Sequence, residues 1–140
     1  MTKQYRRILL ATLLVLLPAV LLADIPTGVT KIFTVQSSPG YTTNLDVYLV
    51  YPGISPKYHT VELRVTGTPA SCTYALEGSA LTLYDNPATT DFGNLSGDID
   101  CTSVTLLHIA NKPVNTVHGH LKALTGGTSP TVQLVYLGVR

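Results

Sequence analysis

Three apolar runs separated by turn residues occupy positions 102–137, and they constrain the fold more than any other part of the chain. The runs cover residues 102–110, 114–124 and 131–137 and are rich in β-branched and other apolar side chains. The breaks between them are Asn111-Lys112-Pro113 and Gly126-Gly127-Thr128-Ser129-Pro130. Short runs bounded by Gly, Pro and Asn are typical of β-strands. The pattern predicts a three-stranded β-meander, which needs a second sheet to cover its apolar face.

The preceding chain repeats this alternation of short runs and turns. Residues 30–36, 45–51, 59–66 and 71–77 are predicted strands, and residues 81–84 are predicted to add a short one. Period-two alternation predicts that Leu63 faces the core, whereas Glu62 and Glu77 face water. The sequence therefore predicts an all-β fold, a single antiparallel two-sheet β-sandwich of about eight strands. Both a jelly-roll and an Ig-like arrangement fit this pattern, after an N-terminal signal helix.

The N-terminus has the pattern of an export signal. Lys3, Arg6 and Arg7 precede an apolar run over residues 8–22, and Ala23 offers a small residue for cleavage. We expect a signal peptide at 1–23 and one β-sandwich domain at 24–140. The alternative is an uncleaved membrane anchor, but the run is shorter than the roughly 20 residues that a spanning helix needs. The expected location is secreted or periplasmic, with no membrane span after cleavage; the alternatives are virion association and retention by the anchor.

Charge argues against nucleic acid as a partner. The net charge of the whole chain is +1, but residues 24–140 hold six Lys or Arg against eight Asp or Glu. Nucleic-acid binding needs a basic face to neutralise phosphates. No such face is evident, so we expect no nucleic-acid partner.

Cys72 and Cys101 are the two cysteines, and both follow the export signal. An even count in an oxidising compartment predicts a disulfide, and two separate buried thiols are the alternative. The bond would close a loop of about 30 residues and contribute roughly 3 kcal/mol to stability. Cys72 is expected on the core face of its strand, where a bond between the two sheets would require it.

Two groups of polar residues are candidates for metal sites. His118 and His120 share one face of a predicted strand, and His108 is expected on the neighbouring strand of the meander, which would suit zinc or copper. The alternative is a solvated polar face. Asp91, Asp98 and Asp100, with Asn94, would suit calcium, or would cap turns. Neither group completes a ligand set, so no metal and no other cofactor is predicted.

The stretch 85–100 is predicted to be a long surface loop and the place where a ligand binds. Its candidates for binding are Asp91 and Asn94, joined by Tyr58 and Tyr84 near loops. No nucleophile elbow, phosphate-binding loop or zinc-protease motif occurs in the sequence. We therefore predict no catalytic residues and no enzymatic activity.

Residues 71–138 carry a family resemblance. The residues concerned are Leu76-Glu77-Gly78-Ser79, the stretch His108-Ile109-Ala110-Asn111-Lys112-Pro113-Val114 and residues 121–132. They resemble a group of small β-sandwich proteins encoded among bacteriophage and prophage structural genes. That group commonly has a short Asp-Gly-x-x-Trp turn after the Leu-x-Gly-Ser strand end; here residues 80–91 replace it and Trp is absent. The resemblance implies a β-sandwich with a non-enzymatic structural role in a virion or on a surface.

These observations favour an exported structural or assembly module that associates with itself, or with a larger particle or surface, through protein contacts. The alternative is a module that binds a carbohydrate or another ligand through the 85–100 loop. An exposed apolar patch or an unpaired edge strand would favour assembly. A concave face lined with Tyr and Asp would favour ligand binding.

Overall fold

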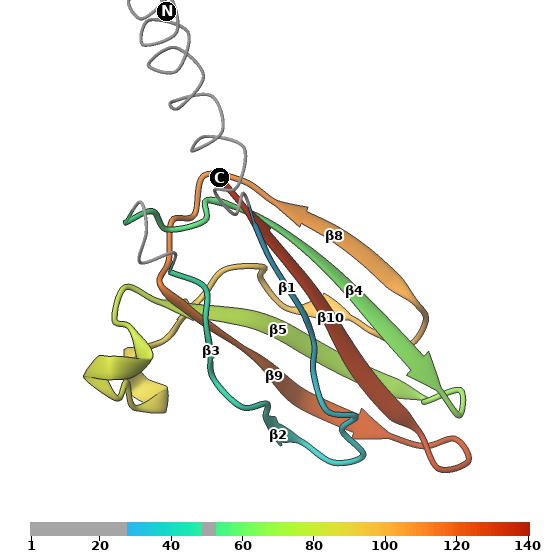
Figure 1. Ribbon diagram of the computed structural model, residues 1–140. Coiled ribbons are helices and arrows are strands. Elements are labelled where there is room, and N and C mark those ends of the chain that lie inside the picture. Colours follow the sequence, from blue (N-terminus) through green and yellow to red (C-terminus); the bar gives the residue numbers. More distant parts are fainter. Residues whose placement is uncertain (1–27, 49–52) are drawn as a thin grey trace, which may run out of the picture.

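The computed structural model describes residues 28–48 and 53–140 and shows two antiparallel β-sheets packed face to face (Figure 1). Sheet A has the strand order β1 (Gly28–Ile32), β10 (Thr131–Val139), β4 (Tyr58–Thr66) and β8 (Thr105–Ile109). The main path of sheet B is β2 (Gly40–Tyr41), β9 (Thr116–Thr125), β5 (Ser71–Ser79) and β6 (Gly93–Asn94). In addition, β3 (Leu45–Asp46) pairs with β9, and β7 (Ile99–Asp100) pairs with β5. The predicted all-β fold of two antiparallel sheets is confirmed, with ten strands in place of about eight.

Some predictions fall on residues that the structure does not describe. The predicted signal peptide and the end of the predicted strand 45–51 lie outside the described residues. Within the described ranges, no helix has the length and apolar character needed to cross a membrane.

The four long strands form the core because their sequences alternate. Side chains at every second position of β4, β5, β9 and β10 point between the sheets and are almost fully buried. The largest of these side chains are Tyr74, Tyr136, Leu63, Leu76, Leu121 and Leu134. Burial of such side chains, at about 25 cal/mol per Å² of apolar surface, is the main force that holds the two sheets together.

The predicted meander is wrong. β8 and β10 belong to sheet A, whereas β9, which lies between them in the chain, belongs to sheet B. The turn after β4 and the turn after β9 cross between the sheets together, and the backbone N–H of Thr128 donates to the carbonyl of Gly67 at 3.1 Å. A Cβ at Gly127 would lie 2.1 Å from that same carbonyl oxygen, so the crossing needs glycine. Alternation fixes which face of a strand is apolar, but it does not fix the sheet that the strand joins.

Shorter elements also differ from expectation. The predicted strand at 81–84 overlaps a short 3₁₀ helix, η1 (Leu83–Asp85), and a second, η2 (Thr89–Asp91), follows it. The strands β2, β6 and β7 were not predicted, because two residues are too few to show a period.

Cys72 and Cys101 form a disulfide with a Cα–Cα distance of 4.8 Å, and both are buried. The bond lies within sheet B and not between the sheets. Cys72 is on β5 and Cys101 directly follows β7, whose residues pair with β5. The backbone N–H of Cys101 donates to the carbonyl of Cys72 at 3.0 Å, so the bond continues that pairing by one residue.

Candidate functional site

A polar cluster lies on the outer face of sheet B, where β5 and β9 run side by side. In this pair Glu77 is directly opposite His118, and His120 lies two residues further along β9 on the same face. Nε2 of His118 lies 3.0 Å from Oε2 of Glu77, and Nδ1 of His120 lies 2.9 Å from Oε1. One carboxylate therefore accepts hydrogen bonds from two imidazoles. We call Glu77, His118 and His120 the histidine cluster.

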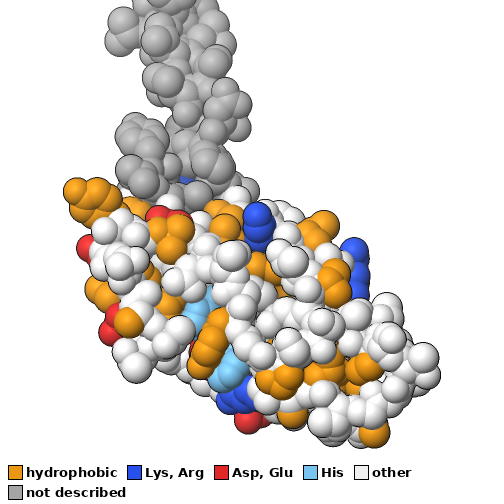
Figure 2. Space-filling model, turned by 90° about the horizontal axis from the view of Figure 1, so that it is seen from below, with side chains coloured by type: hydrophobic (Ala, Val, Ile, Leu, Met, Phe, Trp, Pro, Cys, Tyr) orange, Lys and Arg blue, Asp and Glu red, His pale blue; other side chains and the backbone are white. Residues whose placement is uncertain are grey.

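Aromatic rings from two other segments cover the histidine cluster. The ring of Tyr41, on β2, stacks on His120 with a centroid distance of 4.1 Å. The ring of Phe92, just after η2, stacks on His118 at 3.9 Å. Nδ1 of His118 also lies 2.9 Å from the side-chain amide of Asn44. On the face shown in Figure 2, histidine side chains lie among hydrophobic ones, with basic and acidic side chains close by.

Burial and hydrogen bonding together shift the pKa values of His118 and Glu77. The side chain of His118 has no exposed surface, and desolvation lowers its pKa, although Glu77 acts in the opposite direction. Burial alone would raise the pKa of Glu77, but the hydrogen bonds from His118 and His120 outweigh it and lower this pKa. The carboxylate thus stays ionised and fixes both rings. The expected solvated face is wrong for Glu77 and His118, which the β2–β3 segment and Phe92 cover.

The histidines expected to share one face are divided between the sheets. His108 is on β8 in sheet A, where its Nδ1 lies 2.9 Å from Oγ1 of Thr60, whereas His118 and His120 are on β9 in sheet B. Within residues 28–48 and 53–140, no group of three or more His, Cys, Asp or Glu side chains has an arrangement that could hold a metal ion. The histidine cluster can exchange protons, and its contacts hold the β2–β3 segment and Phe92 against sheet B.

The acidic residues of the 85–100 stretch mostly fix its backbone. Oδ2 of Asp91 accepts from the N–H of Ala88 at 2.7 Å, and Oδ1 of Asp100 accepts from the N–H of Thr102 at 2.9 Å. Oδ1 of Asn94 accepts from the N–H of Gly97 at 2.8 Å. These contacts are turn chemistry, the alternative to calcium ligation.

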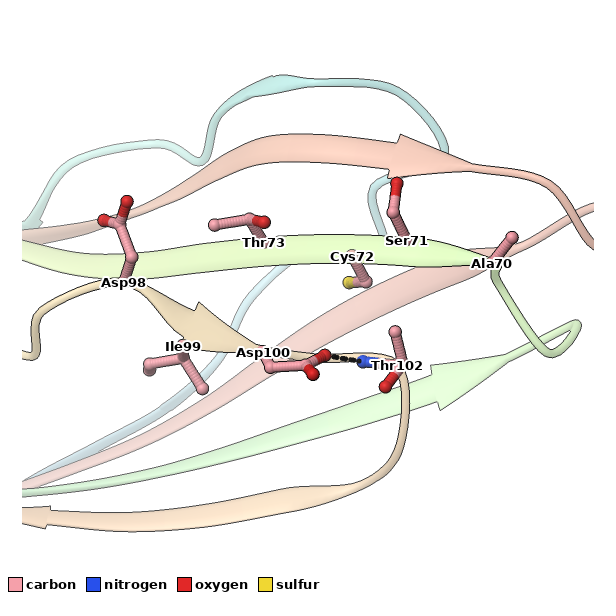
Figure 3. Close-up of a pocket in the computed structure, with 8 residues that line it drawn as sticks. All are labelled: Ala70, Ser71, Cys72, Thr73, Asp98, Ile99, Asp100 and Thr102. Carbon is pink, nitrogen blue, oxygen red and sulfur yellow. Dashed lines mark hydrogen bonds between the residues drawn. The ribbon is translucent and has the colours of Figure 1, made fainter.

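A shallow pocket of about 500 Å³ lies where β7 pairs with β5 (Figure 3). It is lined by Ala70, Ser71, Cys72, Thr73, Asp98, Ile99, Asp100 and Thr102. Its polar groups are hydroxyls and two carboxylates, and Lys122 pairs with Asp98 beside it. The predicted binding residues Tyr58, Tyr84, Asp91 and Asn94 do not line it. Tyr58 lies at the start of β4 and is 39% exposed, and Tyr84 lies in η1 and is 97% exposed.

The outer face of sheet A carries exposed apolar side chains. Cross-strand pairing aligns Ile32 on β1 with Val135 on β10, then with Glu62 on β4 and Leu106 on β8. Directly paired residues project from the same face, so these four form one row across the sheet. Ile32 is 54% exposed and Leu106 is 61% exposed, and Leu137, in the adjacent row, is 38% exposed. We call Ile32, Leu106, Val135 and Leu137 the sheet A patch.

Sequence reasoning missed several of the residues that organise these surfaces. The alternation of its strand predicts that Glu77 faces solvent, and no pattern in the sequence connects Tyr41, Asn44 or Phe92 with the histidines. A carboxylate in one strand and a His-x-His in another are visible in the sequence, but only the register of β5 on β9 brings them together. The sheet A patch combines residues from three strands, so it depends on the strand order in the same way.

Comparisons with known proteins support the fold. No protein-family model and no curated protein matches the chain. A solved structure of the SPBc2 prophage-derived protein YomS is similar, with a TM-score of 0.50 and 15% identity, covering 83% of this chain and 97% of that one. The K2 cleaved adhesin domain of Lys-gingipain is also similar, with a TM-score of 0.50 and 9% identity, covering 73% of this chain and 64% of that one. At these identities the likeness concerns the fold alone, and at that level the resemblance to a phage-encoded β-sandwich is confirmed.

Proposed function

We propose that this protein is a non-enzymatic, exported assembly module that associates with copies of itself or with a larger particle through the outer face of sheet A. The observation that carries the proposal is the sheet A patch. Apolar side chains on a sheet face that has no covering layer among the described residues favour burial against a partner. The fold likeness to a prophage-derived protein and to an adhesin domain supports a role in binding other proteins.

The composition of the face fits a protein contact better than a catalytic surface. Its charges are few, and Glu62 is already paired with Arg64 on the same strand at 2.8 Å. Around the sheet A patch lie Thr30 and Thr60, which are short and lose little rotamer freedom when a partner covers them. Within the row, Glu62 lies between Val135 and Leu106, so the face presents apolar side chains on both sides of one ion pair.

The test is the mass of the protein in solution, measured by light scattering over micromolar concentrations. We expect mass to rise with concentration, and Leu137→Lys to reduce that rise, because a charge would have to be buried. Leu83→Lys is the matched control, since Leu83 is 42% exposed but lies in η1, away from sheet A. Both variants carry the same N-terminal segment. A mass that stays monomeric at every concentration would count against self-association.

The pocket beside β7 supports a second candidate function, the binding of a carbohydrate or another hydroxyl-rich ligand. Its hydroxyl groups on Ser71 and Thr73, and the carboxylates of Asp98 and Asp100, are the donors and acceptors that polyhydroxylated ligands use. Figure 3 shows Ser71 and Thr73 on β5, Asp100 on the adjoining strand β7 and Asp98 just before β7. A glycan-array screen tests it, with Thr73→Val expected to weaken any glycan bound in the pocket and Thr66→Val, on β4, as the control.

A further inference from the structure

We infer that the edge strand β8 pairs in antiparallel fashion with β8 of a second copy, joining two A sheets into one. This inference rests on the self-association in the proposed function, and it places the contact between two copies at an edge of sheet A, which leaves the sheet A patch on the joined outer face. β8 is at one end of sheet A, and its only neighbour among residues 28–48 and 53–140 is β4 (Figure 1). No strand of the described part pairs with the backbone groups on its other edge, which a further strand could therefore use.

The two ends of sheet A differ in how they resist such pairing. β1 carries Lys31, and a lysine on an edge strand opposes the approach of another strand. β8 has the sequence TLLHI, with no Lys, Arg, Asp, Glu or Pro. Val104, just before it, is 65% exposed, and Leu106 within it is 61% exposed. The end of the sheet without a protecting charge is thus also the more apolar end.

The sequence of β8 is compatible with itself in this arrangement. An antiparallel pairing centred on Leu107 places Leu106 of one copy opposite His108 of the other, and Thr105 opposite Ile109. No acidic or basic side chain meets one of like charge, which would oppose the pairing. Because the pairing has two-fold symmetry, it closes after two copies.

The joined sheet would also extend the sheet A patch. Leu106 lies in the same cross-strand row as Val135 and Ile32, so two copies would place two such rows on one continuous outer face. Of the inward-facing side chains, Leu107 would meet Leu107 of the second copy and Ile109 would meet Thr105, beside the cores of the two sandwiches. Backbone hydrogen bonds give the contact its strength, and the rows of side chains fix its register.

The test compares two lysine variants of the whole protein by light scattering. Leu106→Lys places a charge on β8, and we expect the concentration needed for dimers to rise at least tenfold. Ile32→Lys is the matched control, because Ile32 is 54% exposed in the same cross-strand row but on β1. Thermal unfolding of both variants verifies that each one folds.

A cysteine pair tests the register. In a Leu106→Cys/His108→Cys variant, each introduced thiol faces its partner in the second copy, so we expect a covalent dimer after mild oxidation. The single variant Leu106→Cys is the control, because its two thiols lie too far apart along the strands to bond. The β8 pairing is supported if Leu106→Lys loses dimers while Ile32→Lys keeps them, and if the Leu106→Cys/His108→Cys variant forms a covalent dimer.

Other outcomes separate this inference from the proposed function. If Ile32→Lys weakens association as much as Leu106→Lys and no covalent dimer forms, the outer face packs against a partner and the β8 pairing is overturned. If the unaltered protein is monomeric at every concentration, both self-association and the β8 pairing are overturned.

Discussion

Glu77 on β5 accepts a hydrogen bond from Nε2 of His118 on β9 at 3.0 Å, and the histidine ring is completely buried. The same carboxylate holds His120 at 2.9 Å. Through these two rings the interaction reaches Tyr41 and Phe92, which come from segments about 50 residues apart in the sequence. One carboxylate therefore ties the β2–β3 segment and the segment after η2 to the outer face of sheet B.

Replacement of this carboxylate is expected to destabilise the fold. We expect Glu77→Gln to lower the free energy of unfolding by about 1–3 kcal/mol, because a buried hydrogen-bonded group loses its charged partner. Urea denaturation measures the change. Glu62→Gln is the control, since Glu62 forms an exposed ion pair with Arg64 and its loss should leave the midpoint unchanged. Equal effects of the two substitutions would contradict the structural role of Glu77.

Removal of the disulfide is expected to have a larger effect. Cys72 and Cys101 are 29 residues apart in the sequence. In the chain-entropy model, a disulfide that closes a loop of this length restricts the unfolded chain and contributes roughly 3–4 kcal/mol to stability. We expect Cys72→Ala/Cys101→Ala to lower the unfolding midpoint in urea by a corresponding amount. A reducing agent should do the same to the unaltered protein and nothing to the double variant. An unchanged midpoint in the double variant would show that the loop is not restricted by the bond.

A fall in pH is expected to lower the free energy of unfolding through protonation of His59. This buried ring donates from Nε2 to the carbonyl of Lys112 at 2.8 Å, and its Nδ1 lies 2.7 Å from the hydroxyl of Tyr136. Burial lowers the pKa of His59 in the folded state, although the hydrogen bond to Lys112 opposes this. The unfolded chain therefore binds the proton more readily, and the free energy of unfolding falls as pH drops below about 6.5.

Urea denaturation between pH 7.5 and 5 measures this dependence on pH. We expect His59→Gln to reduce the slope, because the titrating group is gone. His108→Gln is the control, since His108 is exposed on β8. A slope that is the same in His59→Gln and in the unaltered protein would assign the effect to other groups, such as His118, whose pKa burial also lowers.

Substitutions at Gly97 and Gly127 distinguish the effect of backbone strain from the effect of a steric clash. Gly97 and Gly127 have φ angles of +73° and +72°, so a side chain strains the backbone at both, by roughly 1–2 kcal/mol. A Cβ at Gly97 meets no atom within 4 Å, whereas one at Gly127 would lie 2.1 Å from the carbonyl oxygen of Gly67. We expect Gly127→Ala to lower the thermal midpoint clearly more than Gly97→Ala. Similar losses would mean that the two turns can move apart.

Much of the secondary structure was predictable, because long strands with one buried face show a period of two. The predicted strands 59–66 and 71–77 match β4 and β5 to within two residues, and 114–124 matches β9 equally well. The sheet membership was not predictable. Residues such as Val117 and Val132 are inward-facing and apolar whether consecutive strands pair with each other or cross between sheets.

The candidate surfaces were predictable only in part. The polar face of β9 and the exposure of Tyr84 agree with the pattern of the sequence. The contact between Glu77 and His118 was not predictable, because it requires the register of two strands that lie about 40 residues apart. Burial of His118 further depends on Phe92, which comes from a stretch without any period.

The joint crossing of the two turns between the sheets has a consequence for the speed of folding. Each long strand pairs with a distant one: Ser71 bonds to Thr125 across 54 residues, and Thr66 to Thr131 across 65. A high contact order of this kind is associated with slow folding, because the chain loses the entropy of closing large loops before the strand contacts stabilise it. The disulfide links Cys72 on β5 to Cys101, which lies in the segment between β5 and β9, and so shortens the loop that must close for these strands to pair. Chains oxidised before they fold should therefore reach the native topology faster than reduced ones.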